Sequence, residues 1–172
     1  MLLEAGAVPF MLSTVPQLLL INETNNFIWG RGKNPWNVLR SCGGSSGGEA
    51  GLVSSGCSPI GIGSDGGGSV RIPAIYCGLH AFKPTGNRFT MAGHKKSSEY
   101  NPRHIQSAVG PLAKNTDDCE RLIKALCNQE LMHSEEPLKK FSPWNISNKP
   151  ELSSKIIQRK LRIGYITNFK VR

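Results

Sequence analysis

The stretch "GGSSGGEAGLVSSGCSPIGIGSDGGGS", residues 43–69, decides how the rest of the chain is interpreted. Eleven of its 27 residues are glycine and seven are serine, whereas all 172 residues include only 19 glycines. A flexible Gly/Ser linker would carry no apolar pattern. The apolar residues that interrupt the small ones here are Leu52, Val53, Ile60 and Ile62. We therefore expect a folded segment that needs bare backbone at many points.

A serine nucleophile on a sharp strand-to-helix turn is one alternative, because Gly43–Gly47 fits the pattern G-x-S-x-G. That turn follows a hydrophobic strand and needs an acid and then a histidine downstream. The preceding "NVLRSC" is a poor buried strand, and only His133 follows an acid at a plausible spacing. A phosphate-binding loop fits less well still, since no Gly-Lys-Ser/Thr closes any glycine run.

The other interpretation uses two serine sites, Ser45 and Ser69, which stand 24 residues apart. Three glycines directly precede Ser69, and glycine tolerates the backbone angles that point several N–H groups at one spot. Such a group of donors stabilises a developing oxyanion, at roughly 3–4 kcal/mol for each donor. The spacing therefore favours acyl transfer with Ser69 as the attacking residue.

The stretch "GGSSGGEAGLVSSGCSPIGIGSDGGGSVRIPAIYCGLHAFKPTG", residues 43–86, closely resembles the signature of the amidase signature family. Together with "GAVPF", "VPQ", "NPW" and "KPTGNR", it looks most like the fatty-acid amide hydrolase branch. The resemblance runs from about residue 5 to 90 and more weakly to 128. It implies an α/β fold, here an incomplete part of the family's mixed β-sheet core flanked by helices.

The resemblance also implies a Ser–Ser–Lys triad. Ser69 matches its nucleophile and Ser45 its bridging serine, which sits on a cis peptide. The backbone N–H groups that match the oxyanion hole are those of Gly66, Gly67, Gly68 and Ser69. Supporting roles fall on Ser46, Asp65 and Arg71, and the loop that matches the border of the acyl channel holds Leu18, Leu19 and Leu20.

The triad's lysine is expected outside this chain. In the family it lies well upstream of the bridging serine, and the only lysine before Ser45 here is Lys33, in a Gly/Asn/Pro loop that matches another part of the pattern. The chain thus resembles an interior piece of an amidase, inactive by itself. The family's Lys-Thr-Asn before "VP" is replaced by Leu12-Ser13-Thr14, which changes the detail of the expected pocket.

The expected function is hydrolysis of a carboxylic amide, and the expected substrate within that class is a fatty-acid amide. The reaction is expected to need neither a cofactor nor a metal. The alternatives are a general amidase, an amidotransferase subunit that uses glutamine, and a non-catalytic truncated relative. The expected partner is a small, lipid-like amide, and a homodimer stays open. The expected location is intracellular, with membrane association through segments outside these residues.

The net charge of +9 is concentrated in residues 139–172, which carry nine basic residues and one acidic residue. No nucleic-acid motif or interleaved aromatic residues accompany these charges, so we expect no nucleic-acid partner. The five cysteines form no C-x-x-C pair or metal spacing and indicate free thiols in a reducing compartment. The N-terminus lacks the basic region of a signal peptide.

One partial amidase domain is predicted over residues 1–172, with its signature at about 43–90 and a basic, loop-rich segment at 134–172. The predicted helices are 47–57, a turn over 69–76 broken at Pro73, and a helix in "NTDDCERLIKALCNQ" with a capping box from Asp117 to Glu120. The predicted strands are 59–63, 78–85 and 160–166, and 30–40 is predicted to be a loop.

Overall fold

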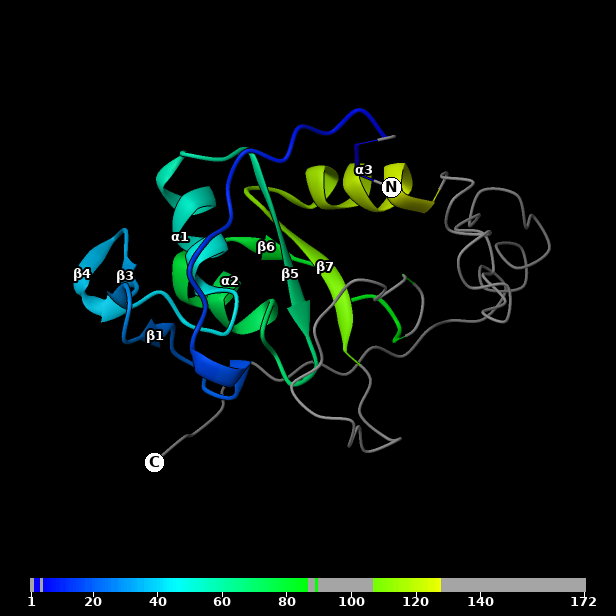
Figure 1. Cartoon of the computed structure of the whole chain (residues 1–172). Helices are drawn as coiled ribbons and strands as arrows, with labels where there is room; N and C mark the ends of the chain where they lie inside the picture. Colours follow the sequence, from blue (N-terminus) through cyan, green and yellow to red (C-terminus); the bar gives the residue numbers. More distant parts are fainter. Residues whose placement is uncertain (1, 4, 87–88, 90–106, 128–172) are drawn as a thin grey trace, which may run out of the picture. The chain divides into compact units, whose positions relative to one another are not determined.

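The computed structural model describes residues 2–3, 5–86, 89 and 107–127 (Figure 1). The predicted strand at 160–166, the basic segment 134–172 and His133 lie outside these residues. The described elements are the 3-10 helix η1 (Gln17–Leu19), β1 (Asn25–Asn26), β2 (Gly30–Arg31), β3 (Lys33–Asn34), β4 (Asn37–Ser41), α1 (Gly47–Ser55), β5 (Ile60–Asp65), α2 (Arg71–Cys77), β6 (His80–Ala81), β7 (Ala108–Ala113) and α3 (Thr116–Cys127).

A three-stranded sheet in the order β5-β7-β6 forms the centre of the described fold (Figure 1). The long pair, β5 with β7, runs in unbroken register from Ile60 opposite Ala113 to Asp65 opposite Ala108. Every pairing among the described strands is antiparallel, so the parallel pairs of the expected mixed sheet do not occur in this part of the chain. Helices and strands nonetheless alternate along it, as an α/β chain requires.

The central strand β7 was missed by sequence reasoning because Gly110 and Pro111 are typical of a turn. Proline belongs on a strand only where its missing N–H is not needed. The carbonyl of Pro111 accepts from the N–H of Phe82 at 3.3 Å, so its backbone polar edge faces the segment after β6. The ladder with β5 therefore loses no donor at Pro111.

Bare backbone lets α1 lie close to β5. A Cβ at Gly61 would come within 2.6 Å of Glu49 Oε2 and 3.2 Å of Val53 Cγ2. Ala50 and Val53 are fully buried on the helix, and Gly56 ends it with a left-handed φ of 83°. The predicted small-residue helix and the strand that follows it are confirmed, but most residues of β5 are half-buried rather than buried.

Helix α2 corrects the predicted break at Pro73, since it continues from Arg71 to Cys77. Pro73 is the third residue of the helix, and N–H groups in a first turn have no partner within a helix. The proline therefore removes no helical hydrogen bond.

Three further boundaries differ from the prediction. The strand expected over 78–85 is reduced to the two residues of β6. The loop expected over 30–40 holds β2 and the hairpin β3–β4. Helix α3 is confirmed, but its cap is Asn115, whose Oδ1 accepts from the Asp118 N–H at 2.8 Å, rather than Asp117.

None of the helices in the described part of the chain is both long and apolar enough to cross a lipid bilayer.

The space around Gly110 on β7 and around Gly51 on α1 predicts opposite effects on stability when each glycine is changed to alanine. A Cβ at Gly110 would collide with the Phe82 carbonyl oxygen, which belongs to the backbone, whereas a Cβ at Gly51 meets nothing within 4 Å. Gly110→Ala should lower the free energy of unfolding by about 1–3 kcal/mol. Gly51→Ala, inside α1, should raise it by about 0.5–1 kcal/mol. Urea denaturation followed by circular dichroism measures both, and equal effects would contradict this packing.

Candidate active site

The first serine loop, residues 43–47, connects β4 to α1 and is buried throughout. The peptide bond between Gly44 and Ser45 is cis. A Cβ at Gly44 would lie 2.9 Å from the Glu23 backbone, and one at Gly43, where φ is 79°, would lie 2.7 Å from Pro73 Cα. Only glycine fits at these two positions, so the double glycine allows the loop to enter the core.

The second serine loop, residues 66–70, connects β5 to α2. Ser69 is half-buried and Gly67 is exposed, whereas Ser45 and Ser46 are buried. The N–H of Ser46 donates to the Ser69 carbonyl oxygen at 3.0 Å. The structure therefore brings together the two serine sites that the sequence analysis paired.

Ser46 also packs against the sheet. A Cβ at Gly63 on β5 would collide with Ser46 Oγ and would lie 2.7 Å from Ser46 Cβ. The bare backbone of β5 thus makes room for the first serine loop at the end of the sheet where the second loop begins.

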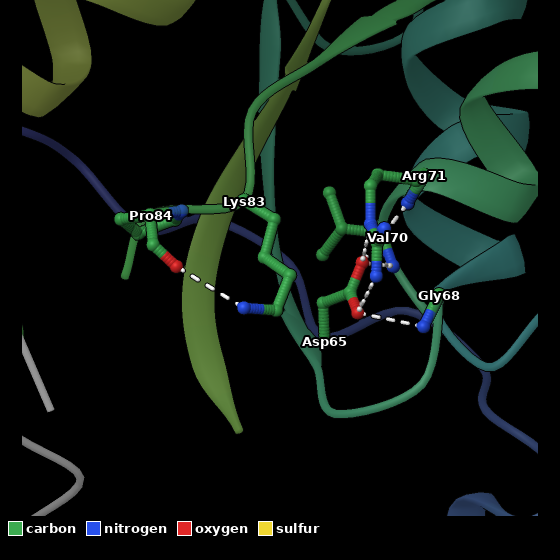
Figure 2. Close-up of polar contacts among 6 residues, drawn as sticks. All are labelled: Asp65, Gly68, Val70, Arg71, Lys83 and Pro84. Carbon is green, nitrogen blue, oxygen red and sulfur yellow. Dashed lines mark hydrogen bonds and ion pairs between the residues drawn. The ribbon is translucent and has the colours of Figure 1, made fainter. Parts of the chain in front are cut away.

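Asp65, the last residue of β5, organises the second loop (Figure 2). Its fully buried carboxylate accepts from the N–H of Gly68 at 2.7 Å, of Val70 at 3.2 Å and of Arg71 at 3.3 Å. The Arg71 guanidinium donates to both carboxylate oxygens, from Nε at 2.9 Å and from Nη2 at 3.0 Å. The expected bracing pair is therefore present, and it closes the turn that carries Ser69.

These contacts shift the acidity of Asp65. Burial by itself raises the pKa of the carboxyl, but the hydrogen bonds from Arg71, Gly68 and Val70 outweigh it and lower the pKa from 3.8 to about 2. The same contact raises the pKa of Arg71. Asp65 is thus a fixed anion at neutral pH and serves as a structural acceptor.

The bond from Gly68 changes the expected set of oxyanion donors. Gly68 has a φ of 117°, as expected for a glycine-only turn, but its N–H points at Asp65 Oδ1. This geometry disfavours Gly68 as a donor to substrate. The backbone N–H groups of Gly66, Gly67 and Ser69 remain as candidates.

Two buried thiols lie next to the start of the first serine loop: Cys42 directly precedes it in sequence, and Cys77 contacts Cys42. Burial raises the pKa of Cys77 to about 11 and also raises the pKa of Cys42. Cys77 Sγ lies 3.4 Å from the Cys42 carbonyl oxygen. Both thiols therefore stay protonated at neutral pH, and neither competes with serine as a nucleophile.

Sequence reasoning missed the side chains that hold the far end of α2. Asn34 Nδ2 donates to the Tyr76 carbonyl at 2.7 Å, and Trp36 Nε1 donates to the Cys77 carbonyl at 2.8 Å. Ser54 Oγ on α1 donates to the same Cys77 carbonyl at 2.9 Å. The "NPW" motif, noticed only as part of a resemblance, therefore caps the helix that follows Ser69, and its turn-like composition gave no sign of this.

Leu18, Leu19 and Leu20, called the leucine loop below, lie between two anchored segments. The earlier segment touches the start of α1, and the later one touches the first serine loop. Before the leucine loop, the Thr14 carbonyl accepts from the Gly48 N–H at 3.2 Å, and Ser13 Oγ donates to Glu49 Oε1 at 2.9 Å. After it, the Glu23 backbone packs on Gly44. Leu18 and Leu20 are exposed, and Leu18 and Leu19 both have left-handed φ values, 55° and 59°.

The lysines of the described residues show no bond to either serine. Lys33 lies exposed on β3, and Lys83 Nζ donates to the Pro84 carbonyl at 3.2 Å (Figure 2). A cavity of about 370 Å³ lies elsewhere, between α3, the start of β5 and residues 2–7, and neither Ser69 nor the leucine loop lines it. No cluster of metal-ligating side chains occurs within the described ranges.

Asp65 predicts a specific loss of stability in acid. Because its folded pKa lies below 3.8, its contribution is complete above about pH 4 and disappears as the pH falls through about 2. The deficit of Asp65→Asn relative to the unmodified chain should therefore shrink by about 2–3 kcal/mol between about pH 5 and pH 2. Denaturation at several pH values measures it, with the exposed Asp117→Asn as control. A deficit that is constant with pH would contradict the assignment.

The family model described as Amidase matches residues 1–172. Fatty-acid amide hydrolase 1 of Sus scrofa is 38% identical over 93% of this chain and 26% of its own length. An acetamidase of Emericella nidulans is 38% identical over 96% of this chain and 30% of its own length. A solved structure of fatty acid amide hydrolase superposes with a TM-score of 0.71 at 38% identity, covering 76% of this chain and 23% of that one.

The chain thus spans between a quarter and a third of the length of these curated relatives. The match to the family model covers every residue, and the likeness in structure covers 76% of this chain. The chain belongs to the amidase family.

Proposed function

We propose that this chain is the serine-bearing part of an amidase that hydrolyses fatty-acid amides. The observation that carries the proposal is the hydrogen bond of 3.0 Å between the Ser46 N–H and the Ser69 carbonyl, which unites the two serine sites. Ser69 is half-buried on a turn whose backbone Asp65 holds in place, so the residue is fixed in the chain and partly accessible.

In the proposed reaction, Ser69 Oγ attacks the amide carbonyl carbon while its proton passes to Ser45. Ser45 in turn gives its own proton to a neutral lysine that lies outside these 172 residues. Backbone N–H groups at Gly66, Gly67 and Ser69 stabilise the oxyanion. As the intermediate collapses, the proton returns through Ser45 to the leaving amine, and water then hydrolyses the acyl-serine.

The lysine has to be neutral near pH 7, which requires burial to lower its pKa by about 3 units from about 10.4. Lys33, the lysine that precedes Ser45 in this chain, is exposed on β3 rather than buried. The proposal therefore assigns the base to a lysine in a better-packed part of the enzyme.

A long acyl chain as substrate is supported by the leucine loop. Its flanking segments touch Gly44 in the first serine loop and Gly48 and Glu49 at the start of α1. Both ends of the leucine loop are therefore held next to the segment that carries Ser45. Each CH₂ group that such a surface removes from water contributes about 0.8 kcal/mol. Leu18, Leu19 and Leu20 are the residues proposed to contact the acyl chain.

A fluorophosphonate probe tests the nucleophile. In a form of the protein that includes the proposed lysine, it should label Ser69, which stands on a turn held by Asp65. Labelling should disappear in Ser69→Ala, decrease in Ser45→Ala, and persist in Ser55→Ala, which changes an exposed serine on α1. Intact mass and peptide mapping identify the modified residue. A probe attached to a different serine, or Ser69→Ala labelling normally, would refute the assignment.

Substrate chain length tests the leucine loop. In a form of the protein with measurable amidase activity, Leu20→Ala should lower kcat/KM for long-chain amides about tenfold more than for short-chain amides. Leu39→Ala is the matched control, because Leu39 on β4 is 83% exposed and Leu20 is 80% exposed. Equal losses on long and short amides would make the loop purely structural.

A further inference from the structure

The side chain of Thr24 contacts both ends of the first serine loop. Thr24 comes from a distant part of the sequence and has no role in the proposed proton transfers. It is fully buried, and in sequence it stands between η1 and β1. Its Oγ1 donates to the Gly43 carbonyl at 2.9 Å and accepts from the Gly47 N–H at 3.1 Å. The Ser45 carbonyl lies 3.5 Å from the same oxygen.

A single hydroxyl therefore connects the two ends of the loop that presents Ser45. A threonine hydroxyl offers one donor and two acceptor sites. Here the proton is directed to Gly43, before the Gly44–Ser45 peptide, and one lone pair to Gly47, after Ser46. In a buried loop, each of these backbone groups would otherwise need another partner.

The connection extends to the nucleophile. The Ser46 N–H, which donates to the Ser69 carbonyl, lies inside the span that Thr24 closes. A loop held at Gly43 and Gly47 keeps both Ser45 and the Ser46 N–H in place. Displacements of about 1 Å at such sites can lower rates about a hundredfold.

The surrounding glycines show that the threonine position is tightly specified. A Cβ at Gly47 would collide with Thr24 Oγ1 and would lie 2.9 Å from Thr24 Cβ. A Cβ at Gly32 would lie 3.4 Å from both Thr24 Cβ and Cγ2. The Gly32 N–H also donates to the Thr24 carbonyl at 2.7 Å, which fixes the backbone on which the side chain stands.

We infer that Thr24 is a positioning residue, which sets the place of Ser45 relative to Ser69 through its hydrogen bonds to Gly43 and Gly47. This inference rests on the proposed function, because it assigns Thr24 a part in the same reaction. Packing of the Thr24 methyl group is the competing explanation, and the hydroxyl and the methyl can be removed separately.

The test uses two variants, made in a form of the protein that includes the proposed lysine. Thr24→Val keeps the branched shape and removes the hydroxyl, whereas Thr24→Ser keeps the hydroxyl and removes the methyl group. The rate of fluorophosphonate labelling at Ser69 should fall by about tenfold to a hundredfold in Thr24→Val and return to within about threefold of the unmodified chain in Thr24→Ser. Amide hydrogen exchange of Ser46 and Gly47 should accelerate only in Thr24→Val.

Ile123→Val, a buried change on α3, serves as the control for general loss of stability. Labelling rates are compared after correction for the folded fraction of each variant. The inference is overturned if Thr24→Val labels at the normal rate, if Thr24→Ser is as slow as Thr24→Val, or if Ile123→Val is slowed equally.

Failure of the proposed function gives a different result. If the unmodified protein does not label at Ser69 although the lysine is present, the proposed chemistry fails, and exchange at Ser46 and Gly47 then decides the role of Thr24. Normal protection of both amides in Thr24→Val would overturn the inference, whereas protection lost in Thr24→Val and restored in Thr24→Ser would support it.

Discussion

The buried carboxylate of Asp65 is the interaction on which the rest of the candidate site depends. It ends β5, accepts three backbone N–H groups from the turn and binds the guanidinium of Arg71. A buried anion is tolerated only when its acceptor sites are filled, and here the turn itself fills them. The same hydrogen bonds therefore hold the turn that carries Ser69 and stabilise the buried carboxylate. Any sequence that kept the serine but lost the acid would have to hold the turn in some other way.

The abundance of glycine follows from close approach between backbones more than from flexibility. At Gly43, Gly44, Gly63 and Gly110 an added Cβ would meet backbone atoms or buried side chains at distances that real Cβ atoms essentially never show. These positions bring the first serine loop against α2, against residue 23 and against β5, and they bring β7 against the segment after β6. Close packing of this kind leaves little room for adjustment, so the two serines are placed by the fold as a whole.

The two serine sites differ in how they are held. The turn before Ser69 is stabilised from within, by an acid and an arginine only six residues apart in sequence. The loop that carries Ser45 has one local contact, in which the Ser41 hydroxyl accepts from the Gly43 N–H at 3.0 Å. Its other support comes from residues 23 and 24, in an earlier part of the chain. This asymmetry explains why Asp65 and Arg71 could be recognised from a short motif, whereas the support of the first serine loop by residues 23 and 24 could not.

The sequence by itself indicated the serine pair, the glycine-rich turn and the helices found at 47–55 and 116–127, and its resemblance to the family marked Asp65 and Arg71 as supporting residues. The turn, the two helices and the Asp65–Arg71 pair depend on residues close together in the chain. Tertiary structure decided what depends on distant partners. It placed Pro111 in a central strand, since the missing N–H faces away from β5, and it let α2 run through Pro73. It directed the Gly68 N–H to Asp65 and brought Thr24, Asn34 and Trp36 to carbonyl and amide groups 19 to 42 residues away. No local pattern encodes such contacts, because a polar side chain reveals its partner only when the chain is folded around it.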